Sequence, residues 1–145
     1  MIDHLMPPER HLKVWMLISA FMYLLAGLAF VLAPDRVFDL INILARQLNL
    51  AAMPYPVEKF WLALSFSMMM TITTLSYMAS RDVRGRRDAI VAVQVSKLVS
   101  SLTSLVFYFT APPAAKFFGY LVIFITDGTI LLITFVLFRR AKADR

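Results

Sequence analysis

The chain has 145 residues, of which 60% are hydrophobic, and it carries a formal net charge of +6. Soluble domains are about 45–50% apolar, so this composition excludes an ordinary soluble domain and indicates an integral membrane protein. The absence of cysteine excludes disulfides and thiolate metal sites, and since both histidines precede the apolar runs, we expect neither a metal nor a cofactor.

The segment before the first apolar run, residues 1–13, is polar and mixed in charge. Because proline lacks an N–H group, we expect Pro7 and Pro8 to delay the first helix until Glu9. Residues 1–13 are therefore predicted to lie at the surface.

Four long apolar segments follow, at about residues 14–33, 60–80, 89–111 and 117–138. Each is long enough to cross a hydrocarbon layer of about 30 Å at about 1.5 Å per residue. The first run is followed by Pro34-Asp35 in place of a small-residue cleavage site, so we interpret it as a retained span. The sequence predicts an all-α fold, an integral membrane four-helix bundle that forms a single transmembrane domain over residues 1–145.

The first connection contains an amphipathic segment at about residues 35–48, with Asp35 as the expected N-cap. Its apolar residues recur at helical spacing and its polar residues occupy the opposite side. The apolar set is Val37, Ile41, Leu44 and Leu48, and the polar set is Asp39, Asn42 and Arg46. Two placements are open for this helix: in the membrane interface, or packed across the mouth of the bundle.

Lys97 and Asp127 are the only charged residues inside the four apolar segments. An isolated charge in hydrocarbon is costly, so such residues usually face a partner or a wet cavity. Counted from the basic side of the membrane, helix geometry places them at depths of roughly 12 and 16 Å. We therefore expect them to form a pair between the third and fourth spans.

Lys97 belongs to a polar stripe on the third span, and a second set of hydroxyls follows one face of the second span. The third-span stripe steps by three and four residues and comprises Gln94, Lys97, Ser101, Ser104 and Tyr108; the second-span set comprises Ser67, Thr71 and Thr74. The three adjacent methionines at 68–70 point in different directions on a helix and predict no metal site. We expect the stripe, Asp127 and the second-span hydroxyls to form one intramembrane polar site.

Lysine and arginine are distributed unevenly between the two sides. Ten lie on the side of both termini and four on the other side, which predicts cytoplasmic termini in a bacterial inner membrane. This asymmetry explains the net charge without nucleic acid. The candidates for contact with anionic lipid headgroups or an acidic partner are Arg81, Arg84, Arg86, Arg87, Arg139, Arg140 and Lys142.

These patterns favour a structural or accessory interaction subunit of a homo-oligomer or larger membrane complex. The bilayer, copies of the chain and other membrane subunits are the expected partners. The alternative is a small transporter or hydrophobic-ligand-binding protein that uses Lys97 and Asp127. The serines and threonines in the spans have no histidine base, which argues against hydrolase chemistry, and we do not expect an enzyme.

Overall fold

The computed structural model describes residues 6–55, 59–112 and 116–143. This part of the chain forms five helices, α1 (Pro7–Leu32), α2 (Pro34–Gln47), α3 (Lys59–Arg81), α4 (Arg87–Thr110) and α5 (Phe118–Ala143). Four of them, α1, α3, α4 and α5, are long and apolar enough to cross a membrane. For this part of the chain, the prediction of an all-helical fold with four helices long and apolar enough to span a membrane is therefore confirmed.

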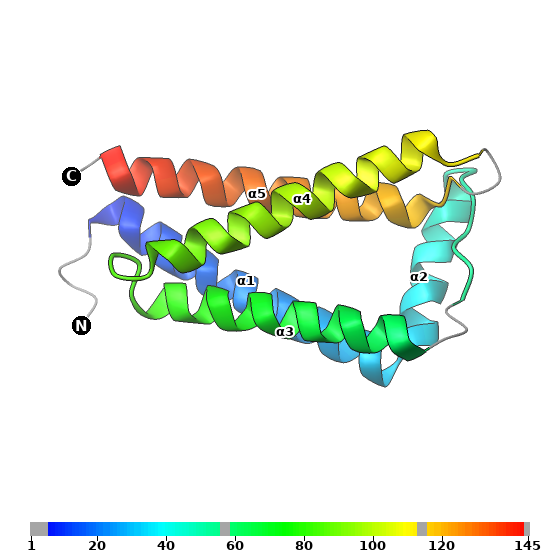
Figure 1. Cartoon of the computed structure of the whole chain (residues 1–145), viewed down its shortest axis with the longest axis horizontal. Helices are drawn as coiled ribbons and strands as arrows, with labels where there is room; N and C mark the ends of the chain where they lie inside the picture. The colour runs from blue at the N-terminus through cyan, green and yellow to red at the C-terminus, as the bar shows by residue number, and fades with distance from the viewer. Residues whose placement is uncertain (1–5, 56–58, 113–115, 144–145) are drawn as a thin grey trace.

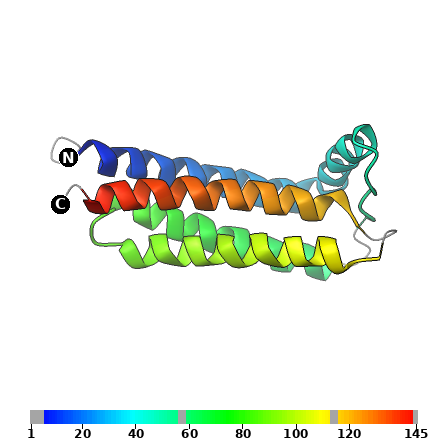
Figure 2. The ribbon, with the colours of Figure 1, turned by 90° about the horizontal axis from the view of Figure 1, so that it is seen from above.

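The four long helices lie side by side and alternate in direction (Figures 1 and 2). The helix α1 packs against α3 and α4 packs against α5, while further contacts join α1 to α5 and α3 to α4. One end of the molecule holds the start of α1, the end of α3, the start of α4 and the end of α5. We call it the basic end, because Arg81, Arg84, Arg86, Arg87, Arg139, Arg140 and Lys142 all lie in these terminal turns or in the α3–α4 connection.

The α1–α3 pair and the α4–α5 pair move apart with distance from the basic end. The helices α3 and α4 lie close together where residues 82–86 connect them, and they separate toward the opposite end, where α2 stands across the long helices (Figure 1). The helix α2 contacts both α1 and α5. It therefore bridges the α1–α3 pair and the α4–α5 pair where these are farthest apart.

The apolar core joins all four long helices and is concentrated near the basic end. Its members are Leu12, Met16, Tyr23, Ile72, Ala79, Val83, Ala89, Ile90, Val93, Ile130 and Ala141. Small alanine side chains recur where helices meet, and they allow the close approach on which packing within a membrane depends. Many large apolar side chains of the same helices are exposed, among them Phe21, Leu64, Val99 and Leu132, which suits contact with lipid.

The start of α1 differs from the expectation. The helix begins at Pro7, because proline is tolerated in the first turn, where its missing N–H would have no partner in the helix. Glu9 is 1% exposed and Leu12 is fully buried, so the predicted surface position is wrong for these residues. Residues 1–5 lie outside the described part of the chain.

Glu9 is buried because it forms an ion pair with Arg84 of the α3–α4 connection. The Arg84 Nη2 and Nε atoms lie 2.6 and 3.0 Å from the two carboxylate oxygens of Glu9. This hydrogen bonding raises the pKa of Arg84 above its ordinary value. The Asp82 carboxylate shapes the turn by accepting hydrogen bonds from the N–H groups of Arg84 and Gly85. The ion pair thus fastens the start of α1 to the α3–α4 connection.

The helix α2 also differs from the expectation in two respects. It begins at Pro34, so Asp35 lies in its first turn and Ala33 occupies the N-cap position. Asn42 lies on the predicted polar side of the helix, but its side chain is buried. Its amide accepts a hydrogen bond from Met53 N–H at 2.7 Å and donates one to Met53 C=O at 2.9 Å.

The burial pattern of α2 reflects its contact with the chain that follows it. Its buried residues are Phe38, Asn42 and Ala45, and the apolar residues exposed on it and just after it are Leu40, Ile43, Leu44 and Leu48. Further along, the N–H of Phe118 donates to the carbonyl of Ala51 at 3.0 Å. The segment after α2 therefore connects this helix to the start of α5. Residues 113–115, which lie between α4 and α5, are outside the described part of the chain.

Replacing Asn42 tests this connection. Asn42→Ala leaves both the N–H and the C=O of Met53 without their partner, so the free energy of unfolding should fall by about 1–3 kcal/mol. The measurement is thermal or denaturant unfolding in detergent. Gln47→Ala is the matched control, because Gln47 is exposed on the same helix. Equal stability of the two variants would contradict the assigned role of Asn42.

Candidate functional site: a charged network inside the four long helices

The structure brings Lys97 of α4 and Asp127 of α5 together. The Nζ and Oδ1 atoms lie 3.1 Å apart, and the two side chains are 5% and 12% exposed. The helices α4 and α5 run in opposite directions, so residues at matching depths from the basic end become neighbours. Each charge is thereby compensated within the protein, as the cost of a bare charge in hydrocarbon requires.

Tyr23 of α1 is the third member of this site. Its hydroxyl donates to Asp127 Oδ1 at 3.3 Å, and its ring centroid lies 4.1 Å from Lys97 Nζ. A phenol suits this position, because its O–H donates to a carboxylate while its ring face attracts an ammonium group. We call Lys97, Asp127 and Tyr23 the charged network.

The spacing of polar residues in the third and fourth spans does not predict Tyr23. Its position in the sequence is nevertheless unusual. Tyrosines in membrane proteins usually lie at the two interfaces, whereas Tyr23 falls in the middle of the first apolar segment. A phenol at that depth needs a polar partner, and Asp127 is the only carboxylate inside the predicted spans.

The remaining members of the α4 stripe extend away from Lys97. Ser101 is buried, and its hydroxyl donates to the carbonyl of Phe124 at 3.1 Å. Gly128 lies opposite, where an added Cβ would sit 3.3 Å from Ser101 Oγ. Close approach of α4 and α5 at this level therefore depends on small residues on both helices. Ser104 is buried, and Gln94 and Tyr108 are half-buried.

The second-span hydroxyls are not part of the charged network. Ser67, Thr71 and Thr74 are exposed on the outward face of α3. Thr71 donates to the carbonyl of Ser67 at 3.0 Å, and Thr74 donates to that of Met70 at 2.9 Å. A hydroxyl bonded to its own helix is satisfied without a partner helix, so these residues tolerate an outward position.

Two further polar contacts of α1 lie on the basic-end side of this network. Trp15 of α1 donates from Nε1 to Thr134 Oγ1 of α5 at 2.8 Å, and Thr134 donates in turn to the carbonyl of Ile130 at 2.7 Å. The Glu9–Arg84 pair lies at the basic end itself. Together with Tyr23, these contacts connect α1 at three successive levels to α5 or to the turn that precedes α4.

The predicted headgroup-binding residues gather at the basic end. Six of them are exposed, Arg81, Arg84, Arg86, Arg139, Arg140 and Lys142, and Arg87 is half-buried. Arg87 and Lys142 line a small pocket with Leu12, Val83, Phe138 and Ala141. Arg84 is already engaged by Glu9, and binding of anionic headgroups by these residues stays a prediction.

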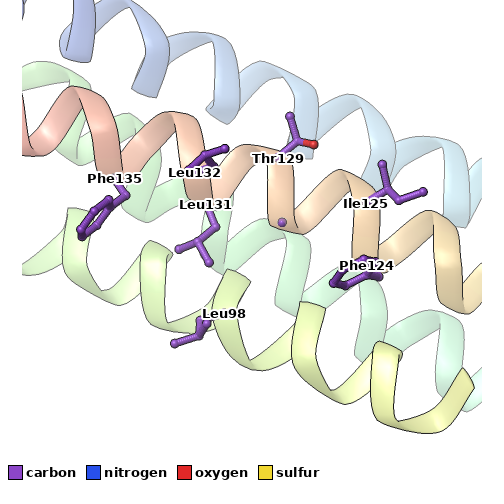
Figure 3. A pocket seen from close by; sticks show the side chains of 8 residues that line it. Leu98, Phe124, Ile125, Thr129, Leu131, Leu132 and Phe135 are labelled. Carbon is purple, nitrogen blue, oxygen red and sulfur yellow. The ribbon is translucent and has the colours of Figure 1, made fainter. Parts of the chain in front are cut away.

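A larger groove lies along α5 and reaches Leu98 of α4 (Figure 3). Its volume is about 720 Å³. It is lined by Leu98, Phe124, Ile125, Gly128, Thr129, Leu131, Leu132 and Phe135. The lining is apolar apart from Thr129, so the groove suits hydrocarbon rather than a polar substrate.

No group of three or more histidine, cysteine, aspartate or glutamate residues that could hold a metal ion occurs in the described ranges. Comparison with protein-family models, with curated proteins and with solved structures gives no match to the chain.

A double-mutant cycle tests the ion pair. Lys97→Met and Asp127→Asn should each lower the free energy of unfolding by about 3–5 kcal/mol, because each leaves one buried charge unpaired. The double variant should be more stable than the sum of the two losses predicts, by at least about 1 kcal/mol. Unfolding in detergent provides the measurement.

The control for this cycle combines Asp127→Asn with Lys116→Met. Lys116 precedes α5 and lies over the Tyr108 ring, about three helical turns from Asp127 and without a contact to it. These two losses should add within about 0.5 kcal/mol. Additive losses for Lys97→Met and Asp127→Asn as well would show that the ion pair does not form.

Two replacements of Tyr23 separate the roles of its hydroxyl and its ring. Tyr23→Phe removes the hydrogen bond to Asp127 and should cost about 1 kcal/mol. Tyr23→Leu also removes the ring beneath Lys97 and should cost about 0.5–2 kcal/mol more. Tyr77→Phe, at an exposed position on α3, should leave the unfolding midpoint unchanged. Equal losses for the two Tyr23 variants would rule out a contribution from the ring.

Proposed function

We propose that the chain is an integral membrane four-helix bundle that acts as a structural or accessory interaction subunit of a homo-oligomer or larger membrane complex. One observation carries this proposal: the members of the charged network bind one another. Lys97 and Tyr23 both direct their polar groups to Asp127 Oδ1. A site of this kind fixes the register of α1, α4 and α5, which is the usual role of polar groups between membrane helices.

The same proposal includes an orientation. The excess of lysine and arginine at the basic end favours a cytoplasmic position for that end in a bacterial inner membrane. The opposite end, with α2, then faces the outer interface. The exposed Leu40, Ile43, Leu44 and Leu48 suit α2 to lie in that interface as an amphipathic helix, and the exposed arginines of the basic end suit contact with anionic headgroups.

The second candidate is a small transporter or hydrophobic-ligand-binding protein that uses Lys97 and Asp127. Four buried side-chain atoms near the charged network favour it, namely Ser19 Oγ, Thr73 Oγ1, Ser76 Oγ and Gln94 Nε2. These atoms make no hydrogen bond to the described residues. Polar groups that serve only to join helices are normally paired, so these four atoms suit contact with a ligand, a proton pathway or bound water.

Native mass measurement after gentle detergent extraction distinguishes the two candidates. The subunit proposal predicts a species that contains several copies of the chain, or the chain with other membrane proteins. Extraction in a harsh detergent should dissociate it and serves as the control. A monomer whose stability increases with a small hydrophobic ligand would contradict the subunit proposal and support the second candidate.

A further inference from the structure

Four buried polar groups on three helices have no hydrogen-bonding partner in the described part of the chain. They are Ser19 of α1, Thr73 and Ser76 of α3, and Gln94 of α4. Ser19 and Ser76 are 1% and 0% exposed. We call these four residues the polar layer.

The members of the polar layer lie at neighbouring levels. Gln94 and Ser19 precede Lys97 and Tyr23 by about one helical turn each, and Lys97 Nζ lies over the Tyr23 ring. Since α1 and α4 both run away from the basic end, Ser19 and Gln94 both lie on the side of the charged network that faces the basic end.

The register of α1 against α3 brings Ser76 to this level as well. A Cβ added to Gly27 would lie 3.3 Å from Met69 Cβ, so these two residues face each other. Ser19 lies eight residues before Gly27, and Ser76 lies seven residues after Met69. In antiparallel helices these offsets bring Ser19 and Ser76 within one turn of each other. Thr73 precedes Ser76 by about one turn and lies at the level of the charged network.

A dry polar layer would be energetically unfavourable. Each buried hydroxyl or amide without a partner carries its full desolvation cost, and the surrounding hydrocarbon offers no replacement. Toward the basic end, the fully buried Leu12, Met16 and Ile90 provide only apolar contacts. A small molecule that both donates and accepts hydrogen bonds would satisfy all four groups.

We infer that the polar layer is a binding site for ordered water between α1, α3 and α4. Water can accept a hydrogen bond from the Gln94 amide nitrogen, which only donates, and can donate to or accept from each hydroxyl. The site adjoins Lys97, whose ammonium group has three protons and one bond to Asp127. Bound water would thereby connect the charged network to the polar layer. This inference goes beyond the proposed function and is independent of it.

Replacement of Ser76 tests this inference, with Ser80→Ala as the matched control. Both serines are buried on α3, but the Ser80 hydroxyl donates to the carbonyl of Tyr77 at 2.7 Å. The control therefore corrects for the higher helix propensity of alanine. If water binds Ser76, both variants lose one hydrogen bond, and the midpoint of Ser76→Ala should be no higher than that of Ser80→Ala. Removal of a dry hydroxyl would instead raise the midpoint of Ser76→Ala above that of the control by roughly 2–4 °C, which would overturn the inference.

A second measurement uses the unmodified protein in lipid bilayers. Transfer of proton polarisation from bound water to side-chain amides is measured by solid-state NMR. The Gln94 amide should receive polarisation from water on the time scale of direct contact. The Asn42 amide, which is held by the backbone of Met53, provides the comparison within the same sample. Absence of transfer to Gln94 would overturn the inference even if the Ser76 variant cannot be purified.

Discussion

A charge inside a hydrocarbon layer has to be compensated by the protein itself, and this constraint organises the structure around Lys97 and Asp127. The ion pair joins α4 to α5, and Tyr23 joins α1 to the same carboxylate. The pair need not add net stability, because desolvation offsets much of its attraction. Its larger effect is on specificity, since any register of these helices that separates the two residues leaves two buried charges without a partner.

The basic end and the α2 end are held together in different ways. At the basic end, the apolar core and the Glu9–Arg84 ion pair bring all four long helices together. Toward the other end the helix pairs diverge, and α2 bridges them through contacts with α1 and α5 (Figure 1). The charged network lies between these regions, and there Tyr23 connects α1 to α5 through its hydrogen bond to Asp127.

The sequence predicts the spanning helices well because the hydropathy and length of each helix can be determined from its own segment, without knowledge of its neighbours. The proximity of Lys97 and Asp127 can also be predicted, because the depth of a residue in the membrane follows from its position along a straight helix at about 1.5 Å per residue. The rotation of each helix is harder to predict, since it depends on which neighbour the helix contacts. Thr71 and Thr74 therefore face outward although their spacing is regular, and Asn42 is buried although it lies on the polar side of its helix. The burial of Glu9 is hard to predict for a related reason, because its partner Arg84 lies 75 residues away in the chain.

The most direct test of this account is the distance between Lys97 and Asp127 in a lipid bilayer. Solid-state NMR can measure the dipolar coupling between ¹⁵N-labelled lysine Nζ and the ¹³C-labelled side-chain carboxyl of aspartate, with Lys97→Met identifying the signal. The account predicts a measurable coupling between Lys97 Nζ and the Asp127 carboxyl carbon, whose Oδ1 atom lies 3.1 Å from Nζ, and the coupling should disappear in the variant. A Lys97 signal without coupling to any aspartate carboxyl would contradict it.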